Sequence, residues 1–207
     1  MRRSNPKSPP SDRTLFETPS VYRPSDAETA APVPPVQAVL FDFSNTIFQM
    51  LDLETWLRRV GAACGRLAVL DEPGAEEAAY RELTAPDAWV PYPDTEPVLR
   101  ALCERGLRVG IVSDFAWDLR THLAHHGLDA LIDTCVISYE QGHEKPDPQL
   151  FLKACADLGA DPRATLMVGD NPIRDGGAAA CGLRTYILPS EHRTGERGLT
   201  DVLRLVA

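Results

Sequence analysis

Val39-Leu-Phe-Asp-Phe-Ser-Asn-Thr46 is an apolar run that ends in an aspartate, with a threonine four residues after that aspartate. The pattern predicts a buried strand that delivers the carboxylate of Asp42 to the edge of a sheet. Ligands of open α/β sheets bind outside the carboxyl ends of the strands, so Asp42 is placed where chemistry occurs. Many strands end in aspartate, so the role of Asp42 must be inferred from the other segments of the chain.

Length and composition limit the class of protein. The chain has 207 residues, 43% of them apolar, and carries 21 basic and 30 acidic side chains for a net charge of −9. This length fits one domain with a modest appendage. The acidic balance argues against a nucleic-acid-binding surface and suits a bound divalent cation. No apolar run has the length of a membrane span, so we expect no membrane partner.

The five cysteines are widely spaced and odd in number. They predict reduced thiols rather than a disulfide framework or a zinc site, which is typical of a cytoplasmic protein. The sequence leaves the oligomeric state open.

Residues 1–35 differ from the rest of the chain. They hold 8 of the 18 prolines and show no periodicity, so we expect a disordered tail. From residue 36 onward, strand-like and helix-like segments alternate. Continuous apolar runs predict buried parallel strands over residues 36–43, 107–113, 131–138, 165–168 and 185–188. Helix-like patterns cover residues 95–105, 118–126, 148–158, 173–180 and 199–205.

Glycines mark the ends of four of these helices. Gly106, Gly127, Gly159 and Gly182 each stand where a C-cap glycine belongs. The repeated strand–helix rhythm predicts an α/β fold with a doubly wound parallel sheet.

Residues 48–90 interrupt the rhythm. They hold two helix-like segments, 53–67 and 74–83, and no convincing strand. We therefore expect a small inserted helical cap over the strand ends, with residues 36–47 and 91–207 forming the α/β core.

Two histidines, His122 and His126, lie four residues apart on one predicted helix. Zinc would require that spacing together with further ligands, and none is evident. We therefore expect a solvated helix face here and no zinc site.

Polar residues follow four of the strands and carry the chemistry. The four segments are Asp42-Phe-Ser-Asn-Thr46, Val112-Ser-Asp114, Gly142-His-Glu-Lys-Pro-Asp-Pro148 and Val168-Gly-Asp-Asn-Pro-Ile-Arg-Asp175. A parallel sheet gathers all four at one edge, where they supply a nucleophilic carboxylate, a hydroxyl, an ammonium group and a pair of carboxylates. Such a set fits phosphoryl transfer, with anions to hold Mg²⁺ and donors to stabilise the transferring group.

In this order the four segments resemble the motifs of the haloacid dehalogenase-like hydrolase superfamily, whose core is Rossmann-like. The resemblance covers the chain from Val36 to its end. The Lys-Pro-Asp-Pro and Gly-Asp-x-x-x-x-Asp segments are similar to those of subfamily IA, which has a helical cap after the first motif. The residues that match site positions of the family are Asp42, Ser44, Thr46, Ser113, Asp114, Lys145, Asp170 and Asp175.

The resemblance implies a catalytic role for three of these residues. Asp42 matches the nucleophile that forms an aspartyl-enzyme intermediate, and Ser113 the hydroxyl that binds a phosphoryl oxygen. Lys145 matches the lysine that neutralises both the nucleophile and the phosphate. Thr46 matches the threonine that orients the first loop, and Asp114, where relatives often have asparagine, is expected beside the phosphate.

The resemblance also implies a magnesium site. Asp42, the backbone carbonyl of Ser44, and Asp170 match metal ligands, and Asp175 matches a carboxylate that acts directly or through water. A carboxylate that attacks a phosphate dianion meets like-charge repulsion, so a cation is needed to offset it. Pro172 suits the first turn of a helix, with Asp175 shortly after it. The substrate implied is a small phosphorylated metabolite.

The chain departs from the family's phosphatases at Ser44. Phosphatases of this family usually carry a second aspartate there, which protonates the leaving group and later activates water. Serine cannot perform that titration near neutral pH. The enzyme could use good leaving groups, or a nearby residue could replace the aspartate, with His143, Glu144 or Asp114 as the candidates.

Two alternatives to a phosphatase remain. The first is a metal-independent 2-haloacid dehalogenase, which would need a cap arginine, and Arg58, Arg59, Arg66 or Arg81 could serve. The aspartate pair of the fourth segment argues against it, because carboxylates beside Asp42 repel one another unless a cation lies between them. The second is a catalytically weak family member that binds phosphate esters and acts in regulation.

Overall fold

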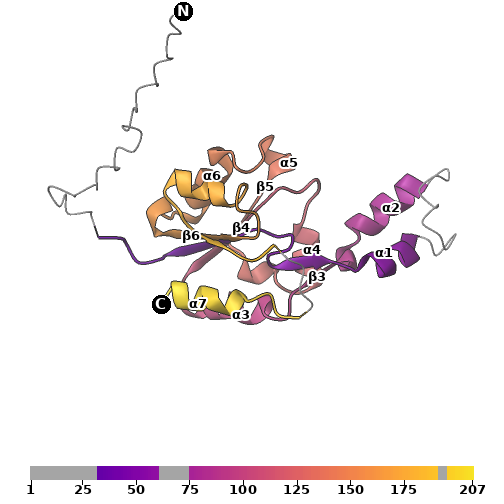
Figure 1. Ribbon diagram of the computed structural model, residues 1–207, viewed down its shortest axis with the longest axis horizontal. Coiled ribbons are helices and arrows are strands. Elements are labelled where there is room, and N and C mark those ends of the chain that lie inside the picture. The colour runs from indigo at the N-terminus through magenta and orange to yellow at the C-terminus, as the bar shows by residue number, and fades with distance from the viewer. Residues whose placement is uncertain (1–31, 61–74, 191–194) are drawn as a thin grey trace, which may run out of the picture. The chain divides into compact units, whose positions relative to one another are not determined.

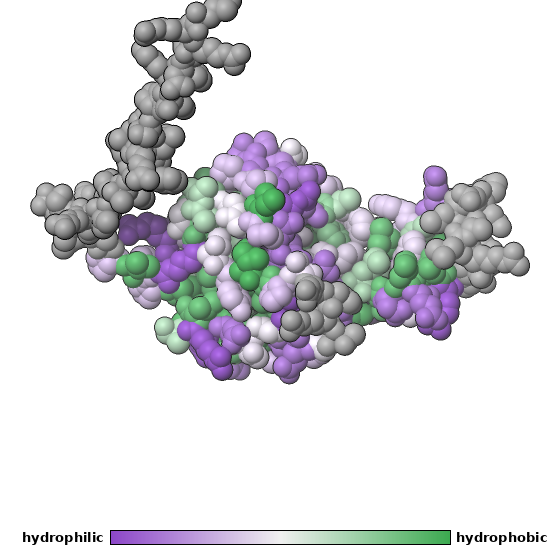
Figure 2. Space-filling view, viewed as in Figure 1, coloured by the Kyte–Doolittle hydropathy of each residue, from purple (hydrophilic) through white to green (hydrophobic). Residues whose placement is uncertain are grey.

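The computed structural model describes residues 32–60, 75–190 and 195–207. The predicted tail falls almost entirely outside these residues, as do Cys64 and Arg66. None of the described helices is long and apolar enough to cross a lipid bilayer. The face seen in Figure 2 mixes hydrophilic and hydrophobic residues, as the surface of a globular protein ordinarily does.

A five-stranded parallel sheet forms the core, which confirms the predicted fold class. Its order is β5-β4-β1-β6-β7. The strands are β1 (Ala38–Phe41), β4 (Arg108–Ser113), β5 (Thr134–Ile137), β6 (Thr165–Gly169) and β7 (Arg184–Ile187). The chain runs from β1 outward to β4 and β5, then crosses to β6 and β7 on the other side of β1. The end of β1 is therefore the switch point of the sheet, and the sheet delivers Asp42 there.

Helices cover both faces of the sheet (Figure 1). Alternate side chains of β1 point to opposite faces, as in any strand. Val39 and Phe41 pack on the side of α3 (Thr95–Glu104) and α4 (Arg120–His125). Ala38 and Leu40 pack against α6 (Pro148–Leu158). The remaining core helices are α5 (Ser138–Gln141), α7 (Val202–Leu205) and the 3₁₀ turns η4 (Asp129–Leu131), η5 (Pro162–Ala164), η6 (Gly176–Cys181) and η7 (Leu199–Asp201).

The helix expected over residues 173–180 is absent, and η6 takes its place. This segment lies close to the loop that carries Lys145. A side chain at Gly177 would place its Cβ 2.4 Å from Cβ of Pro146, so the segment must be glycine there to pack against the loop that carries Lys145. The predicted position of Asp175 within a first α-helical turn is thus wrong, because Asp175 precedes a 3₁₀ turn.

The insertion contains two short strands that the sequence analysis missed. β2 (Phe48–Met50) and β3 (Trp89–Pro91) pair antiparallel, and between them lie α1 (Leu53–Val60), α2 (Ala75–Thr84) and the 3₁₀ turn η3 (Pro86–Ala88). Strands of three residues are too short to show an alternating hydrophobic pattern, and β3 ends in proline. Neither strand could therefore be recognised in the sequence.

The expectation of a solvated histidine face on α4 is wrong. His122 is fully buried, and burial lowers the pKa of its imidazole. The indole of Trp117 donates to Nε2 of His122 at 3.0 Å, so the proton resides on Nδ1, 3.2 Å from the Pro86 carbonyl. Nε2 of His126 lies 2.8 Å from the Trp89 carbonyl. Both histidines therefore hold the base of the insertion against the core.

A buried carboxylate fixes the C-terminal segment beside the first loop. Asp94 accepts hydrogen bonds from the backbone N–H groups of Arg197, Gly198 and Leu199 at 2.9, 2.8 and 2.7 Å. The guanidinium of Arg197 in turn donates to the Asn45 carbonyl at 2.6 Å. Asp94 thereby supports the loop that follows Asp42.

Replacing Asp94 with alanine should lower the free energy of unfolding by about 3 kcal/mol, because three backbone donors would lose a charged acceptor inside the protein. Urea denaturation followed by circular dichroism measures the change. Asp129→Ala, at an exposed position, is the matched control and should have little effect. Equal stabilities of the two variants would contradict the role given to Asp94.

Candidate active site

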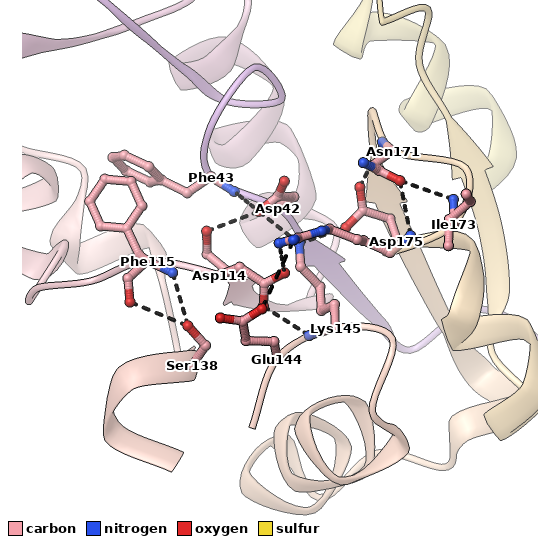
Figure 3. Close-up of polar contacts among 12 residues, drawn as sticks. Asp42, Phe43, Asp114, Phe115, Ser138, Glu144, Lys145, Asn171, Ile173 and Asp175 are labelled. Carbon is pink, nitrogen blue, oxygen red and sulfur yellow. Dashed lines mark hydrogen bonds and ion pairs between the residues drawn. The ribbon is translucent and has the colours of Figure 1, made fainter. Parts of the chain in front are cut away.

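Asp42 lies directly after β1, and three donors converge on one of its oxygens (Figure 3). Oδ1 accepts from the backbone N–H of Phe43 at 2.7 Å and from Oγ of Ser113 at 2.9 Å. Nζ of Lys145 lies 2.9 Å from the same oxygen. Within the described part of the chain, Oδ2 receives no hydrogen bond. The carboxylate is therefore held firmly by one oxygen while the other is available.

Lys145 joins two carboxylates in the interior. Its ammonium group lies 2.9 Å from Asp42 and 2.6 Å from Asp175, and its side chain is only 2% exposed. Burial alone would lower the pKa of Lys145, but the two carboxylates more than offset it, and the pKa is raised. Lys145 therefore stays protonated at neutral pH. Its backbone N–H donates to Asp114 at 2.8 Å, which fixes the loop.

Asp170 and Asp175 complete an acidic cluster with Asp42. The carboxylate of Asp175 is fully buried, and its Oδ2 accepts from the backbone N–H of Asn171 at 2.9 Å. Any side chain at Gly169 would meet this carboxylate at 2.2 Å, so glycine is required at the end of β6. Burial and then the charge of Asp42 raise the pKa of both Asp170 and Asp175.

This donor set fits a divalent cation. Ligand oxygens of Asp42, Asp170 and Asp175 all lie within 4.8 Å of one another. Hard cations such as Mg²⁺ take carboxylate oxygens. The raised pKa values of Asp170 and Asp175 mean that burial and like-charge repulsion disfavour their ionised forms when Lys145 is the neighbouring cation. A bound cation would relieve that repulsion.

A cavity of about 260 Å³ opens above these groups. It is lined by Asp42, Ser44, Asn45, Ser113, Asp114, Lys145, Asp170, Asn171 and Arg174. Six of the eight site residues predicted from the sequence therefore line this one cavity. The other two are Asp175, which is buried behind Lys145, and Thr46, whose buried hydroxyl has no partner among the described residues. The roles given to the eight residues remain predictions.

The sequence did not predict three residues of this lining, Asn45, Asn171 and Arg174. Arg174 lies between the two aspartates of the fourth segment, Asp170 and Asp175, and this position in the sequence could have indicated that it lies at the site. Its guanidinium lies 2.8 Å from Asp114, which forms a wall of the cavity. Asn171 caps its own loop by accepting from the backbone N–H groups of Ile173 and Arg174, each at 3.0 Å.

A second cavity of about 430 Å³ adjoins the first. It is lined by Asp114, Phe115, Ala116, Ser138, Tyr139, Gly142, His143, Glu144 and Arg174. Asp114 and Arg174 belong to both linings, so their ion pair separates the two spaces.

Comparison with known proteins shows the family to which the chain belongs. A model of the haloacid dehalogenase-like hydrolase family matches residues 49–182. Glyceraldehyde 3-phosphate phosphatase from Methanopyrus kandleri is 38% identical over 192 residues, covering 72% of this chain and 82% of that protein. (S)-2-haloacid dehalogenase 4A from Burkholderia cepacia is 33% identical over 109 residues, covering 53% of this chain and 45% of that protein.

A solved structure shows the same fold. The HAD-superfamily hydrolase of subfamily IA from Geobacter sulfurreducens superposes with a TM-score of 0.64 at 19% identity, covering 83% of this chain and 97% of that one. The fold, the sequence relatives and the family model agree, and the chain belongs to the haloacid dehalogenase-like hydrolases. The family is one of hydrolases and includes relatives named as phosphatases.

Mg²⁺ should stabilise the protein through the acidic cluster. At 100 times its dissociation constant, a ligand that binds only the folded state adds about 2.7 kcal/mol to the free energy of unfolding. Asp170→Asn should abolish most of this gain, because it removes a charged oxygen from the cluster. Thermal unfolding with and without MgCl₂ measures both effects, and Asp129→Asn is the control. An equal gain for wild type and Asp170→Asn would place the ion elsewhere.

Proposed function

We propose that this protein is a Mg²⁺-dependent phosphatase that acts on a small phosphorylated metabolite through an aspartyl-phosphate intermediate. The observation that carries the proposal is the convergence of Lys145, Ser113 and two further aspartates on Asp42, beside a cavity large enough for a phosphate group. Relatives named as phosphatases support the same activity. The free thiols of the four described cysteines suit a cytoplasmic enzyme.

The contacts around Asp42 support different proposed tasks for its two oxygens. Oδ1 takes the three donors, and Oδ2 is the oxygen that can attack phosphorus. In the proposed first step, Oδ2 forms a bond to phosphorus and the leaving group departs with the electrons of the broken P–O bond. Lys145 and Ser113 hold the nucleophile in place and offer donors to the phosphoryl oxygens.

The acidic cluster would hold Mg²⁺ through Asp42, Asp170 and Asp175, with the carbonyl of Ser44 as a further predicted ligand. When bound, the ion would neutralise charge on the transferring phosphoryl group and reduce its repulsion by Asp42. The buried ammonium group of Lys145 lies beside Asp42 and would also reduce the repulsion between this carboxylate and the phosphoryl group.

Metal-independent dehalogenation is the second candidate, favoured by the serine at position 44 and by the relative named as a 2-haloacid dehalogenase. Against it, neither cavity includes an arginine of α1 or α2 among its described lining residues. Arg59 is paired instead with Asp87 at 2.9 Å. Chloride release from a 2-haloacid that survives excess EDTA would favour the dehalogenase. Tight binding of phosphate analogues without turnover would favour a regulatory protein.

Asp42→Asn should reduce phosphate release at least about 10⁴-fold, because the amide cannot attack phosphorus. A screen of phosphorylated metabolites with Mg²⁺, read out by free phosphate, identifies the substrate for the measurement. Asp129→Asn tests for nonspecific effects of the same chemical change. Turnover by Asp42→Asn at the wild-type rate would overturn the assignment of the nucleophile.

Ser44→Asp should accelerate hydrolysis of an alkyl phosphate by about 100-fold, because it restores a carboxyl group that can donate and accept a proton beside the leaving group. Ser44→Asn, which is similar in size but cannot titrate, is the matched control. A gain in both variants, or in neither with Mg²⁺ binding intact, would show that proton transfer from position 44 does not limit the rate.

A further inference from the structure

The loop after Asp42 has one backbone carbonyl that its own hydrogen bonds do not use. The carbonyl of Phe43 accepts from the backbone N–H of Phe48 at 2.9 Å, and the N–H of Asn45 donates to the carbonyl of Phe48 at 2.7 Å. Between these two bonds lies the carbonyl of Ser44, which accepts no hydrogen bond from any described residue. Ser44 also lines the cavity that holds Asp42. A carbonyl oxygen in this setting is a suitable ligand for a hard cation.

The direction of the Ser44 carbonyl depends on the conformation of Asn45. The Ser44 carbonyl and the Asn45 N–H belong to one planar peptide group and point in opposite directions. Among the described residues, Asn45 is the one non-glycine residue with a left-handed backbone, at a φ of 55°. Asparagine tolerates this region, but the region is sparsely populated, so surrounding contacts must hold the residue there.

Arg197 supplies the contact on the C-terminal side of Asn45. Its Nε donates to the Asn45 carbonyl at 2.6 Å, and its Nη2 donates to the Pro189 carbonyl at 2.6 Å. Arg197 is only 8% exposed, and its guanidinium lies 5.8 Å from the centre of the Tyr92 ring. No other described residue donates to the Asn45 carbonyl. The conformation of Asn45 therefore depends on a side chain 152 positions away in the sequence.

The position of Arg197 is itself fixed by the core. Asp94 accepts from the backbone N–H of Arg197 at 2.9 Å and from those of the next two residues. In the sheet order, β6 lies between β1 and β7. Asn45 follows β1 and Pro189 follows β7, so Arg197 links the segments on both sides of the end of β6, directly after which lies Asp170.

Arg197 also acts on the acidic cluster through its charge. Burial, and then the charges of Asp42 and Asp175, raise the pKa of Asp170, whereas the charge of Arg197 acts to lower it. A fixed positive charge near the cluster would by itself repel Mg²⁺ and weaken its binding. A contact that orients a ligand of the ion would strengthen binding instead. These two effects of Arg197 on Mg²⁺ affinity have opposite signs, so a binding measurement can separate them.

On the basis of the proposed Mg²⁺-dependent activity, we infer that Arg197 is a positioning residue for the metal site. By holding the Asn45 carbonyl, it fixes the direction of the Ser44 carbonyl, the predicted backbone ligand of the ion. Arg197 acts through the backbone, as groups do that orient metal ligands from outside the ligand shell. Loss of such groups typically weakens metal binding by about 10- to 100-fold.

The test measures Mg²⁺ binding directly, by isothermal titration calorimetry with MgCl₂. Arg197→Met keeps an unbranched stem but removes the charge and every donor. Its dissociation constant should be about 10-fold larger than that of wild type, although loss of the charge alone would make it smaller. Arg197→Lys keeps the charge, but a single ammonium group does not reproduce the two contacts of the guanidinium, and an intermediate loss is expected.

A control variant and a stability measurement complete the test. Arg204→Met makes the same change at a side chain of α7 that is 85% exposed, and it should bind Mg²⁺ as wild type does. Urea unfolding without Mg²⁺ is measured on all variants. A purely structural role for Arg197 would lower stability while leaving the dissociation constant of the folded protein unchanged.

An unchanged or smaller dissociation constant for Arg197→Met would overturn the positioning role. Where Arg197→Met does not fold, wild-type affinity in Arg197→Lys would overturn it instead. Failure of the proposed function gives a different result, because wild type itself would then bind no Mg²⁺, or Asp42→Asn would release phosphate at the wild-type rate.

Discussion

The ammonium group of Lys145 between the carboxylates of Asp42 and Asp175 is the interaction on which the site depends. All three groups are buried, and a buried carboxylate without a partner costs several kcal/mol. Lys145 offsets that cost for two of them, and the cluster still contains a third carboxylate, Asp170. The site is therefore folded around an excess of negative charge. Such an excess is tolerated where function requires a cation.

Two glycines allow these charges to meet. Gly169 leaves room for the carboxylate of Asp175 beside the end of β6, and Gly177 lets the following turn pack against Pro146. Pro146 follows Lys145 directly, so the same packing brings the ammonium group and its partner together. The contact of 2.6 Å between Lys145 and Asp175 thus depends on the close packing at these glycines as well as on charge attraction.

The sequence predicted the alternating strands and helices of the core, but it did not predict features that depend on contacts between distant residues. Buried parallel strands are continuous apolar runs, and all five were found, with Asp42 correctly placed after the first. The α-helix expected over residues 173–180 was wrong: a 3₁₀ turn forms there, and its Gly177 packs against Pro146, a contact that the sequence does not reveal. His122 was predicted to be solvated because its partners, Trp117 and the Pro86 carbonyl, approach it only in the folded chain. Arg174 was missed since its pairing with Asp114 spans 60 residues.

The Asp114–Arg174 pair also connects the loops of the site. Asp114 holds the Lys145 loop through one oxygen and Arg174 through the other, so it links three of the four polar segments after the strands. A neutral residue at position 114 could not neutralise Arg174. The described lining of both cavities comes from these core loops, while His122 and His126 hold the base of the insertion to α4. The described residues that would surround a bound substrate therefore belong to the core.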